Sequence, residues 1–352
     1  MLQERISQLI AGRSQESFDT LALAAFAFQA ERVEPLRALC RRRGIDPAAL
    51  ADWRQVPMVP TSAFKTLVLR SAPEEAVFRS SGTTQGAAAR SAHYHGFLDL
   101  YRQTIDASFP GSCLPPGGAP LSILSLIPPR TDLPDSSLSF MIDHVLAHFG
   151  GPGTAVAFGA RGLDGQALRS WCSARQRDKR PVLILATALS LLQALERLGR
   201  LSLRFRLPAG SVVFETGGFK GHDRYIEPGE LRDLLEQRLG VPAASVVREY
   251  GMTELTSQCY TGALRGEDPE LFVAPPWMRV RVLEPETLEE APHGTAGLLA
   301  LFDLANLSSA VHVLTEDLGV AEGGGFRLVG RAGGAELRGC SLAAEELAAG
   351  DR

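Results

Sequence analysis

The spacing of apolar residues changes twice along the chain. Over residues 1 to about 50, apolar positions recur every three or four residues, and the segment SFDTLALAAFAFQAERVEPLRALCRRRG ends on Gly44. This spacing predicts helices. Further on, short apolar runs alternate with amphipathic segments, as in RPVLILATALSLLQALERLG at 180–199. Strands that alternate with helices predict an α/β fold with mainly parallel sheets flanked by helices.

After about residue 270 the pattern becomes that of short strands and hairpins. The segments that carry it are WMRVRVLEP, AGLLALFDLAN, AVHVLTEDLGVAE and GFRLVGRAG, between residues 277 and 333. We therefore expect residues 1–270 to form a helical N-terminus and an α/β core that binds nucleotide and acyl group. Residues 271–352 are expected to form a small β-rich C-terminal part.

Three polar loops follow the predicted carboxyl ends of strands, at residues 79–86, 215–221 and 249–254. Ligands bind at these ends in open α/β sheets, so the loops are expected to converge on one pocket. The first loop, FRSSGTTQG, is expected to join a strand to a helix over 91–109, and its glycines and hydroxyls suit a phosphate. It is not a Walker A loop, because no Gly-Lys-Ser/Thr follows. A surface turn is the alternative.

Charge and cysteine content narrow the class of protein. A net charge of -4 gives no reason to expect a nucleic-acid or anionic-membrane surface, and no apolar run is as long as a membrane span. The five cysteines form no CxxC pair, which argues against a structural zinc site or a disulfide framework. The opening MLQERISQLIAG is charged, unlike a signal peptide. We therefore expect a cytoplasmic protein.

Four motifs occur in a fixed order: SSGTTQG (80–86), REYGMTE (248–254), TEDLG (315–319) and LVGRAGGAELRG (328–339). They resemble those that surround ATP in adenylate-forming enzymes. More narrowly, SSLSFMIDHVL (136–146), FETGGFKG (214–221) and GAELRGCSL (334–342) resemble the LuxE family of acyl-protein synthetases. The resemblance spans about residues 50–345. It implies the large domain of the adenylate-forming fold.

The resemblance also implies roles for individual residues. Tyr250 and Gly251 would flank adenine, and Thr253 and Glu254 would lie at the α-phosphate and its Mg²⁺. A glutamate suits a hard divalent cation, and hydroxyls with backbone N–H groups can stabilise charge that develops at phosphorus. Asp317 would accept the ribose hydroxyls, and Arg331 would lie near ribose or phosphate. The phosphates of ATP would be held by Ser80, Ser81, Gly82, Thr83, Thr84 and Gly86.

Substrate contacts are expected from two further segments. Gly217 and Gly218 in the FETGGFKG loop would bind substrate, and His144 either faces the acyl pocket or lies on an ordinary helix face. His93 and His95 are expected at the surface or at a helix start. A metal pair is less favoured, because no third ligand is spaced nearby.

The chain departs from the wider superfamily in its lysines. The segment after the hydroxyl-rich loop, AAARSAH, offers Arg90 as its nearest cation, and no lysine follows Lys220. No mobile C-terminal domain with a catalytic lysine is therefore expected, as in the acyl-protein synthetases. The chain has only three lysines, Lys65, Lys179 and Lys220. Lys220 is the candidate cation for the pyrophosphate charge, with a solvated loop lysine as the alternative.

Cys340 is the candidate nucleophile. By the resemblance it fits the C-terminal cysteine on which related synthetases are acylated, and a thiolate can capture a mixed anhydride as a thioester. The nearby Arg338 and Arg331 would favour the thiolate. The alternative is a buried packing cysteine.

Three functions remain open at this stage. The first is an enzyme that forms an acyl-adenylate from a carboxylic acid and ATP, captures the acyl group on Cys340 and transfers it to a reductase, an acyl carrier protein or coenzyme A. The second is an ATP-independent acyltransferase that takes an acyl or aryl group from a CoA thioester and passes it through Cys340 to an acyl carrier protein. The third is a non-catalytic subunit of an acyl-processing complex. The sequence does not say whether the acid is fatty or aromatic.

Overall fold

The computed structural model describes residues 1–352 except 81–89, 116, 218–225, 334–337 and 349–352. The chain divides into two compact units. The first contains residues 1–107, 252–259 and 271–352, and the second contains residues 108–251 and 260–270. Each unit is described by itself below. The boundary expected at residue 270 stays a prediction.

The first unit begins with three helices, α1 (Leu2–Ile10), α2 (Phe18–Arg32) and α3 (Glu34–Arg43). Ser17 caps α2 by accepting a hydrogen bond from the backbone of Thr20, and Gly44 ends α3 with a φ of 62° in the left-handed region that glycine tolerates. Two short elements follow: β1 (Val59–Pro60) and α4 (Ala63–Thr66). The helical N-terminus predicted from apolar spacing is confirmed.

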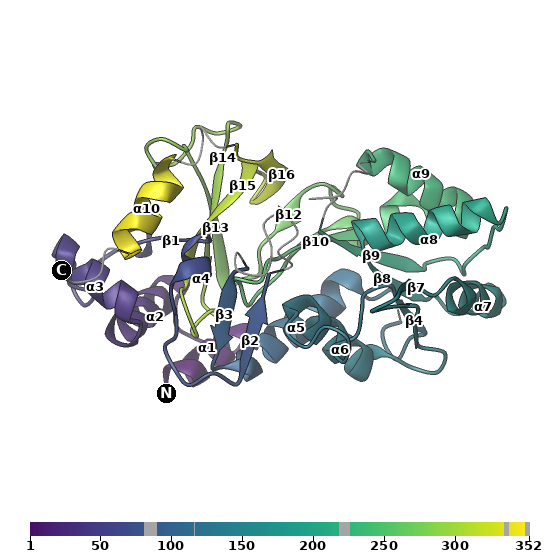
Figure 1. Ribbon diagram of the computed structural model, residues 1–352, viewed down its shortest axis with the longest axis horizontal. Helices are drawn as coiled ribbons and strands as arrows, with labels where there is room; N and C mark the ends of the chain where they lie inside the picture. Colours follow the sequence, from purple (N-terminus) through teal and green to yellow (C-terminus); the bar gives the residue numbers. More distant parts are fainter. Residues whose placement is uncertain (81–89, 116, 218–225, 334–337, 349–352) are drawn as a thin grey trace. The chain divides into compact units, whose positions relative to one another are not determined.

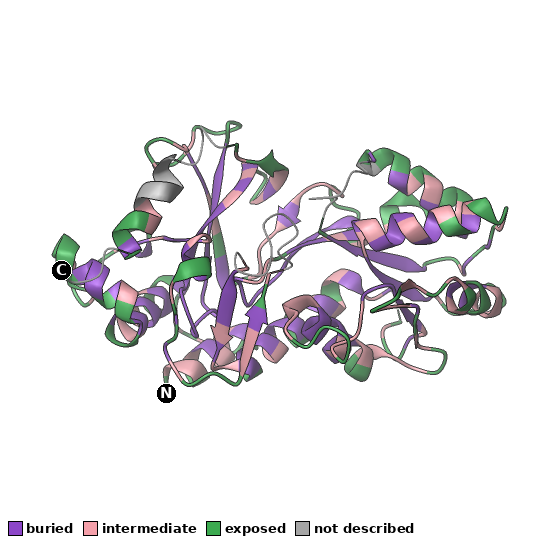
Figure 2. Cartoon of the chain, viewed as in Figure 1, coloured by how far each residue is buried: buried purple, intermediate pink, exposed green. Residues whose placement is uncertain are grey.

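The sheet of the first unit is mainly antiparallel (Figure 1). Its strands run in the order β13 (Met278–Leu283), β14 (Ala296–Asp303), β15 (His312–Glu322), β16 (Gly325–Arg331) and β12 (Phe272–Val273), and β1 pairs with β15 in parallel. Figure 2 shows β14 buried along most of its length. These are the strands that the sequence predicts after residue 270.

The core of this unit joins the N-terminal helices to the sheet. Phe18 of α2 lies edge-on to Trp53 of a short 3-10 helix (Trp53–Gln55) and to Phe302 of β14, with ring centroids 5.6 and 5.7 Å apart. All three rings are buried. Burial of such aromatic side chains contributes roughly 1.5–3 kcal/mol each, so the helices and the sheet form one core.

A β-hairpin lies within the first unit where the sequence predicts a strand followed by a helix. Strand β2 (Ala76–Arg79) pairs antiparallel with β3 (Ala92–His95). Helix α5 (Leu98–Cys113) begins only after it and ends in the second unit. The expected helix start at 91 is therefore wrong, because Ala92–His95 pairs with a strand more than ten residues away. The hydroxyl-rich loop connects two strands.

The second unit is a parallel sheet with helices on both faces (Figure 1). Its strands run in the order β10 (Val246–Tyr250), β9 (Val212–Thr216), β8 (Leu183–Thr187), β4 (Ile123–Ser125) and β5 (Ala155–Val156), with each neighbouring pair parallel. The helices are α6 (Ser137–Phe149), α7 (Gly165–Arg175), α8 (Ala188–Arg200) and α9 (Pro228–Leu239). The unit also has β6 (Phe158–Gly159), β7 (Gly162–Leu163) and 3-10 turns at Ala243–Ser245 and Ala263–Arg265.

Strand alternation divides the side chains of this sheet between its two faces. Ile184 and Val213 lie in register and pack into the core with residues of α7, α8 and α9. Phe214 is the next residue along β9, and its ring lies 6.0 Å from that of Phe109 at the end of α5. Thr187 ends β8 and caps α8 in a capping box, so strand and helix are joined without a loop.

The α/β class with mainly parallel sheets and a β-rich C-terminal part is confirmed by these two units. Strand β11 (Cys259–Thr261) is shared between them in sequence, and the last helix, α10 (Arg338–Ala348), belongs to the first unit. Among the residues that the structure describes, no helix is long and apolar enough to cross a membrane.

Candidate active site

The turn after β10 carries the central residues of the YGMTE motif. Tyr250 ends β10 in the second unit, whereas the segment from Met252 to Cys259 belongs to the first unit. The backbone N–H of Leu255 donates to the carbonyl of Met252 at 3.1 Å, which closes a turn around Thr253 and Glu254. Thr253 is half-buried, and the side chain of Glu254 is only 7% exposed.

Glu254 is a buried carboxyl group with opposed influences on its charge. Burial raises the pKa of Glu254, while a hydrogen bond from the Ser91 hydroxyl and the charges of Lys65 and Arg331 lower it. The raised pKa means that desolvation is the larger effect. A buried carboxylate near two cationic side chains is typical of a site that binds a metal ion or carries out chemistry on a phosphate.

Asp317 and Arg331 lie opposite each other on neighbouring strands. They are in register between β15 and β16, and the register shifts between Leu318 and Gly319. The Asp317 side chain is 7% exposed, and its backbone N–H donates to the Thr315 hydroxyl at 3.1 Å. Arg331 forms an ion pair with Glu316 at 2.7 Å. The Thr-x-Asp and Gly-Arg motifs therefore meet at one edge of the hairpin, as a shared ligand would require.

Ser80 stands at the mouth of the β2–β3 hairpin. Its hydroxyl accepts a hydrogen bond from the Ser91 backbone N–H at 2.9 Å, and its own N–H donates to the Ser91 carbonyl at 3.1 Å. Ser80 thus fixes the strand that carries Ser91, the residue that binds Glu254. The other phosphate-loop predictions, Ser81, Gly82, Thr83, Thr84 and Gly86, lie outside the described residues.

In the second unit, polar residues lie at the carboxyl ends of β9 and β10. Thr216 and Glu249 are in register, and the Thr216 hydroxyl donates to the buried Glu249 carboxyl group. Burial raises the pKa of Glu249 to about 7. Gly217 follows β9 with a φ of 70°, which favours glycine, whereas Gly218 and Lys220 lie outside the described residues. The roles of these residues stay predictions.

His144 lies on α6 and is 9% exposed. Its ring stacks on that of His148, with centroids 3.9 Å apart, and the His148 ring contacts the His144 carbonyl through Nδ1 at 2.9 Å. The burial distinguishes it from an exposed helix-face histidine, and substrate binding by His144 stays a prediction.

Cys340 lies in the first turns of α10, and its side chain is outside the described part of the structure. The helix packs against α3, α4, β1 and β15 (Figure 1). Near its end Leu347 is buried, and Glu346 pairs with Arg43 of α3. The candidate nucleophile Cys340 is therefore a residue of a helix whose other end packs against the rest of the first unit.

The other four cysteines are buried thiols. Burial raises the pKa of Cys172 to about 12 and also raises the pKa values of Cys40 and Cys113. Cys259 Sγ lies 3.5 Å from Met278 Sδ. Thiols held in their neutral form are poor nucleophiles, so we interpret Cys40, Cys113 and Cys172 as packing residues.

His93 and His95 are not at the surface or at a helix start. Both are fully buried on β3, with ring centroids 4.2 Å apart. Burial lowers the pKa of His93 to about 4. Within the described ranges no group of three or more His, Cys, Asp or Glu side chains could hold a metal ion. A single carboxylate such as Glu254 still fits Mg²⁺, because this ion uses one or two carboxylates together with substrate phosphates.

Sequence reasoning missed Lys65 and Asn306. Lys65 is exposed on α4, and its charge acts on Glu254. The scarcity of lysine was the available signal. Asn306 is fully buried and donates to the Glu254 carbonyl at 2.8 Å. Its signal was the cluster of Asn306, Ser308 and Ser309 between two apolar strands.

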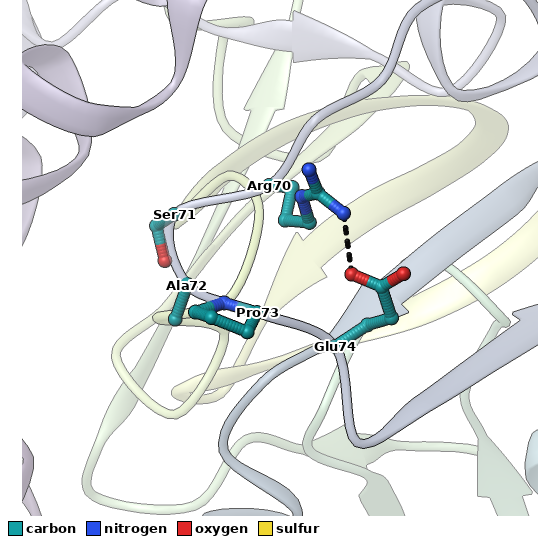
Figure 3. Close-up of a pocket in the computed structure, with 5 residues that line it drawn as sticks. All are labelled: Arg70, Ser71, Ala72, Pro73 and Glu74. Atoms are coloured by element: carbon teal, nitrogen blue, oxygen red, sulfur yellow. Dashed lines mark hydrogen bonds and ion pairs between the residues drawn. The ribbon is translucent and has the colours of Figure 1, made fainter.

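A hollow of about 310 Å³ is formed by the consecutive residues Arg70–Glu74 (Figure 3). Figure 3 shows the ion pair between Arg70 and Glu74, 2.5 Å long, across one side of it. None of the predicted site residues lines this hollow, so it is not the predicted nucleotide site.

Solved structures of adenylate-forming enzymes share this fold. One of 2-hydroxyisobutyryl-CoA ligase, in complex with 2-HIB-AMP and CoA, covers 91% of this chain and 75% of its own, with a TM-score of 0.62 and 18% identity. ATP-bound MatB from Rhodopseudomonas palustris covers 81% of this chain and 52% of its own, with a TM-score of 0.50 and 17% identity. The chain therefore shares the fold of these ligases.

The chain belongs to the acyl-protein synthetase family LuxE, which matches residues 8–348. It is also 27% identical over 139 residues to the long-chain-fatty-acid–luciferin-component ligase of Vibrio harveyi. That match covers 37% of this chain and 35% of the ligase, so the chain spans about a third of the length of this curated relative. The family resemblance stated from the motifs is confirmed.

Proposed function

We propose that this chain activates a carboxylic acid with ATP and then holds the acyl group on Cys340 as a thioester. The observation that carries the proposal is the Glu254 turn: a buried carboxyl group, bound by Ser91 and attended by Lys65 and Arg331, at the end of a parallel strand. The LuxE family and the adenylate-forming fold support the same reaction class.

In the first step an oxygen of the substrate carboxylate attacks the α-phosphorus of ATP. The bond from that phosphorus to the pyrophosphate oxygen breaks, and pyrophosphate leaves with the electron pair. Lys65 and Arg331 would offset the negative charge that gathers on the phosphate oxygens, and Thr253 would donate its hydroxyl to one of them. Asp317 would accept the ribose hydroxyls and so orient the nucleotide.

Mg²⁺ would be held by Glu254 together with phosphate oxygens, and when bound it supplies positive charge at the reacting phosphate. The protein's own part is to counteract the effect of burial on the charge of Glu254. The Ser91 hydroxyl and the two neighbouring cations favour its charged form and so oppose the cost of desolvation.

In the second step the Cys340 sulfur, as a thiolate, attacks the acyl carbonyl carbon of the mixed anhydride. The bond from that carbon to the phosphate oxygen breaks, AMP leaves, and the thioester forms. Transfer from Cys340 to a reductase, an acyl carrier protein or coenzyme A completes the proposed cycle. A fatty acid is the favoured substrate, because the ligase of Vibrio harveyi that this chain resembles is named for one.

ATP–pyrophosphate exchange with a panel of fatty and aromatic acids tests the first step. We expect exchange with the wild-type chain and a loss of about 100-fold or more in Glu254→Gln, which keeps the shape of the side chain but removes its charge. Glu286→Gln, at an exposed turn, is the matched control. Wild-type exchange in Glu254→Gln would remove this residue from the mechanism.

Labelling with a radioactive acid tests the second step. The wild-type chain should retain a label that neutral hydroxylamine releases, and Cys340→Ala should retain none while still exchanging pyrophosphate. A label on another cysteine would return Cys340 to a packing role. Labelling by acyl-CoA without ATP would select the ATP-independent acyltransferase instead.

A further inference from the structure

The Thr253–Glu254 turn is held from behind by two buried side chains. The Nδ1 of His93 lies 2.7 Å from the Thr253 carbonyl oxygen. The Nδ2 of Asn306 lies 2.8 Å from the Glu254 carbonyl oxygen and 2.8 Å from that of Ala310. His93 and Asn306 are both fully buried. Neither contact involves the Glu254 carboxyl group, so both act on the backbone that aims it.

The partners of His93 determine where its proton lies. A carbonyl oxygen only accepts hydrogen bonds, so Nδ1 must carry the proton that Thr253 receives. Burial lowers the pKa of His93 to about 4, so the ring is neutral at pH 7 and its Nε2 is bare. Nε2 must then accept from the Ser309 hydroxyl, 2.9 Å away. The Nδ1–H tautomer is the one that satisfies both neighbours.

This assignment orders the rest of the network. The Ser309 oxygen also lies 3.0 Å from Asn306 Oδ1, but its single proton is used on His93, so Asn306 Oδ1 accepts from the Thr256 hydroxyl, 3.3 Å away. The Thr256 oxygen in turn accepts from Nε2 of His95, also at 3.3 Å. Each hydroxyl then donates once. These hydrogen bonds involve the residues on both sides of Glu254.

The next two residues of the turn are fixed in the same way. Asp303 accepts from the backbone N–H groups of Thr256 and Ser257 at 3.0 and 2.8 Å. The backbone from Thr253 to Ser257 is thus held by side chains at four residues, and the backbone hydrogen bond from Leu255 to Met252 closes a turn there. The sequence places these side chains on β3, on β14 and in the loop between β14 and β15.

We propose that His93 is a positioning residue for adenylation: its Nδ1–H fixes the carbonyl of Thr253, the residue before Glu254, and so sets the direction of Glu254. The inference rests on the proposed role of Glu254. It predicts that the position of the ring proton, rather than the volume of the ring, determines the rate.

Two substitutions separate the effect of the His93 ring proton from the effect of the side-chain volume. In His93→Asn the side-chain amide N–H can replace Nδ1–H, whereas in His93→Gln the amide reaches the position of Nε2 and leaves the Thr253 carbonyl without its donor. We expect His93→Gln to lower kcat for pyrophosphate exchange about 10- to 100-fold, as loss of an outer-shell partner does, with little change in the KM for ATP. His93→Asn should retain kcat within about 3-fold by restoring the same hydrogen bond.

Controls distinguish positioning from folding. His293→Gln, at an exposed position, should behave as wild type, and thermal unfolding should show that both His93 variants are folded. Equal kcat values in His93→Asn and His93→Gln would overturn the proposal. Absence of exchange in the wild-type chain with every acid would refute the proposed function instead.

The tautomer is measured on the unaltered protein by two-dimensional ¹⁵N NMR of the histidine rings. We expect the His93 ring to be neutral at pH 7 with its proton on Nδ1. A proton on Nε2 would overturn the inference even if both variants failed to fold.

Discussion

Asp303→Asn is expected to destabilise the first unit by about 2 kcal/mol. One carboxylate oxygen of Asp303 accepts from the N–H groups of Thr256 and Ser257, and the other accepts from the Ser257 hydroxyl at 2.7 Å and the Ala305 N–H at 3.0 Å. An asparagine offers an oxygen on one side only. Its NH₂ group on the other side would face at least one N–H donor, so a buried donor loses its acceptor.

The magnitude follows from these contacts. A hydrogen bond to a charged acceptor contributes about 1.5–3 kcal/mol, and the two bonds that remain on the other oxygen become weaker because the acceptor is neutral. Burial raises the pKa of Asp303, so removing the buried charge recovers part of the loss. The difference leaves a net cost of about 2 kcal/mol. We also expect lower exchange activity, because Thr256 and Ser257 continue the Glu254 turn.

Urea unfolding followed by fluorescence measures the effect, with the midpoint shifted and the slope unchanged. Asp46→Asn is the matched control, since exposed Asp46 accepts a single N–H, from Ala48 at 3.0 Å, and an asparagine oxygen replaces it. The control should change stability by less than about 0.5 kcal/mol. A change as small in Asp303→Asn would refute the reasoning that all four donors need the carboxylate.

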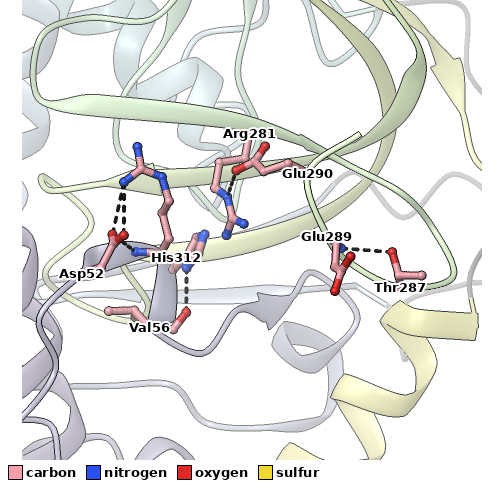
Figure 4. Close-up of polar contacts among 8 residues, drawn as sticks. Asp52, Val56, Arg281, Thr287, Glu289, Glu290 and His312 are labelled. Atoms are coloured by element: carbon pink, nitrogen blue, oxygen red, sulfur yellow. Dashed lines mark hydrogen bonds and ion pairs between the residues drawn. The ribbon is translucent and has the colours of Figure 1, made fainter. Parts of the chain in front are cut away.

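Two further substitutions test the charges described above. Lys65→Gln should lower kcat for pyrophosphate exchange about 10-fold or more, and it should move the acid limb of the pH–rate profile upward, because the pKa of Glu254 rises further without this cation. Lys179→Gln, exposed in the second unit, is the control, and equal effects of the two would exclude a specific role for Lys65. His312 is buried, donates from Nδ1 to the Val56 carbonyl at 2.9 Å (Figure 4), and burial lowers its pKa to about 3. The unfolded chain therefore binds a proton below about pH 6.5 that the folded chain excludes, so stability falls as pH falls, by about 2 kcal/mol between pH 6.5 and 5 from this group. His312→Asn keeps the donor and should reduce this pH dependence by that amount in urea unfolding at pH 7 and pH 5, whereas parallel pH dependences would contradict the assignment.

Local signals predicted most elements of the fold. The apolar run VLILA is followed by Thr187, whose side chain caps the next helix, so one short segment predicts both strand β8 and helix α8. The strands after residue 270 are likewise predicted by short local runs of apolar residues. Where pairing partners lie far apart, local signals fail: Ala92–His95 pairs with β2, and no local pattern marks that strand.

The sequence predicts the motif residues of the candidate site, but it does not predict the buried side chains that hydrogen-bond to their backbone. Glu254, Asp317 and Arg331 stand in motifs with recognisable spacing. Asn306 contacts the Glu254 backbone across about fifty positions, and His93 contacts Thr253 across more than a hundred. Hydrogen bonds between such distant residues depend on the completed fold, so the sequence alone does not specify them.

The first unit is built from separate segments of the chain, so its core cannot form until the last of these segments has been synthesised. Phe18 and the other apolar residues of α2 pack on Phe302, and the buried Gln29 donates to the carbonyls of Asn306 and Leu307. At roughly 5–20 residues per second, the ribosome needs about 15–60 s to travel from residue 18 to residue 302. During that interval the N-terminal helices expose apolar faces, while the whole second unit has already emerged. We therefore expect nascent chains that include the second unit but lack the last strands of the first unit to bind chaperones through α2. Chains that also include those last strands should no longer bind them.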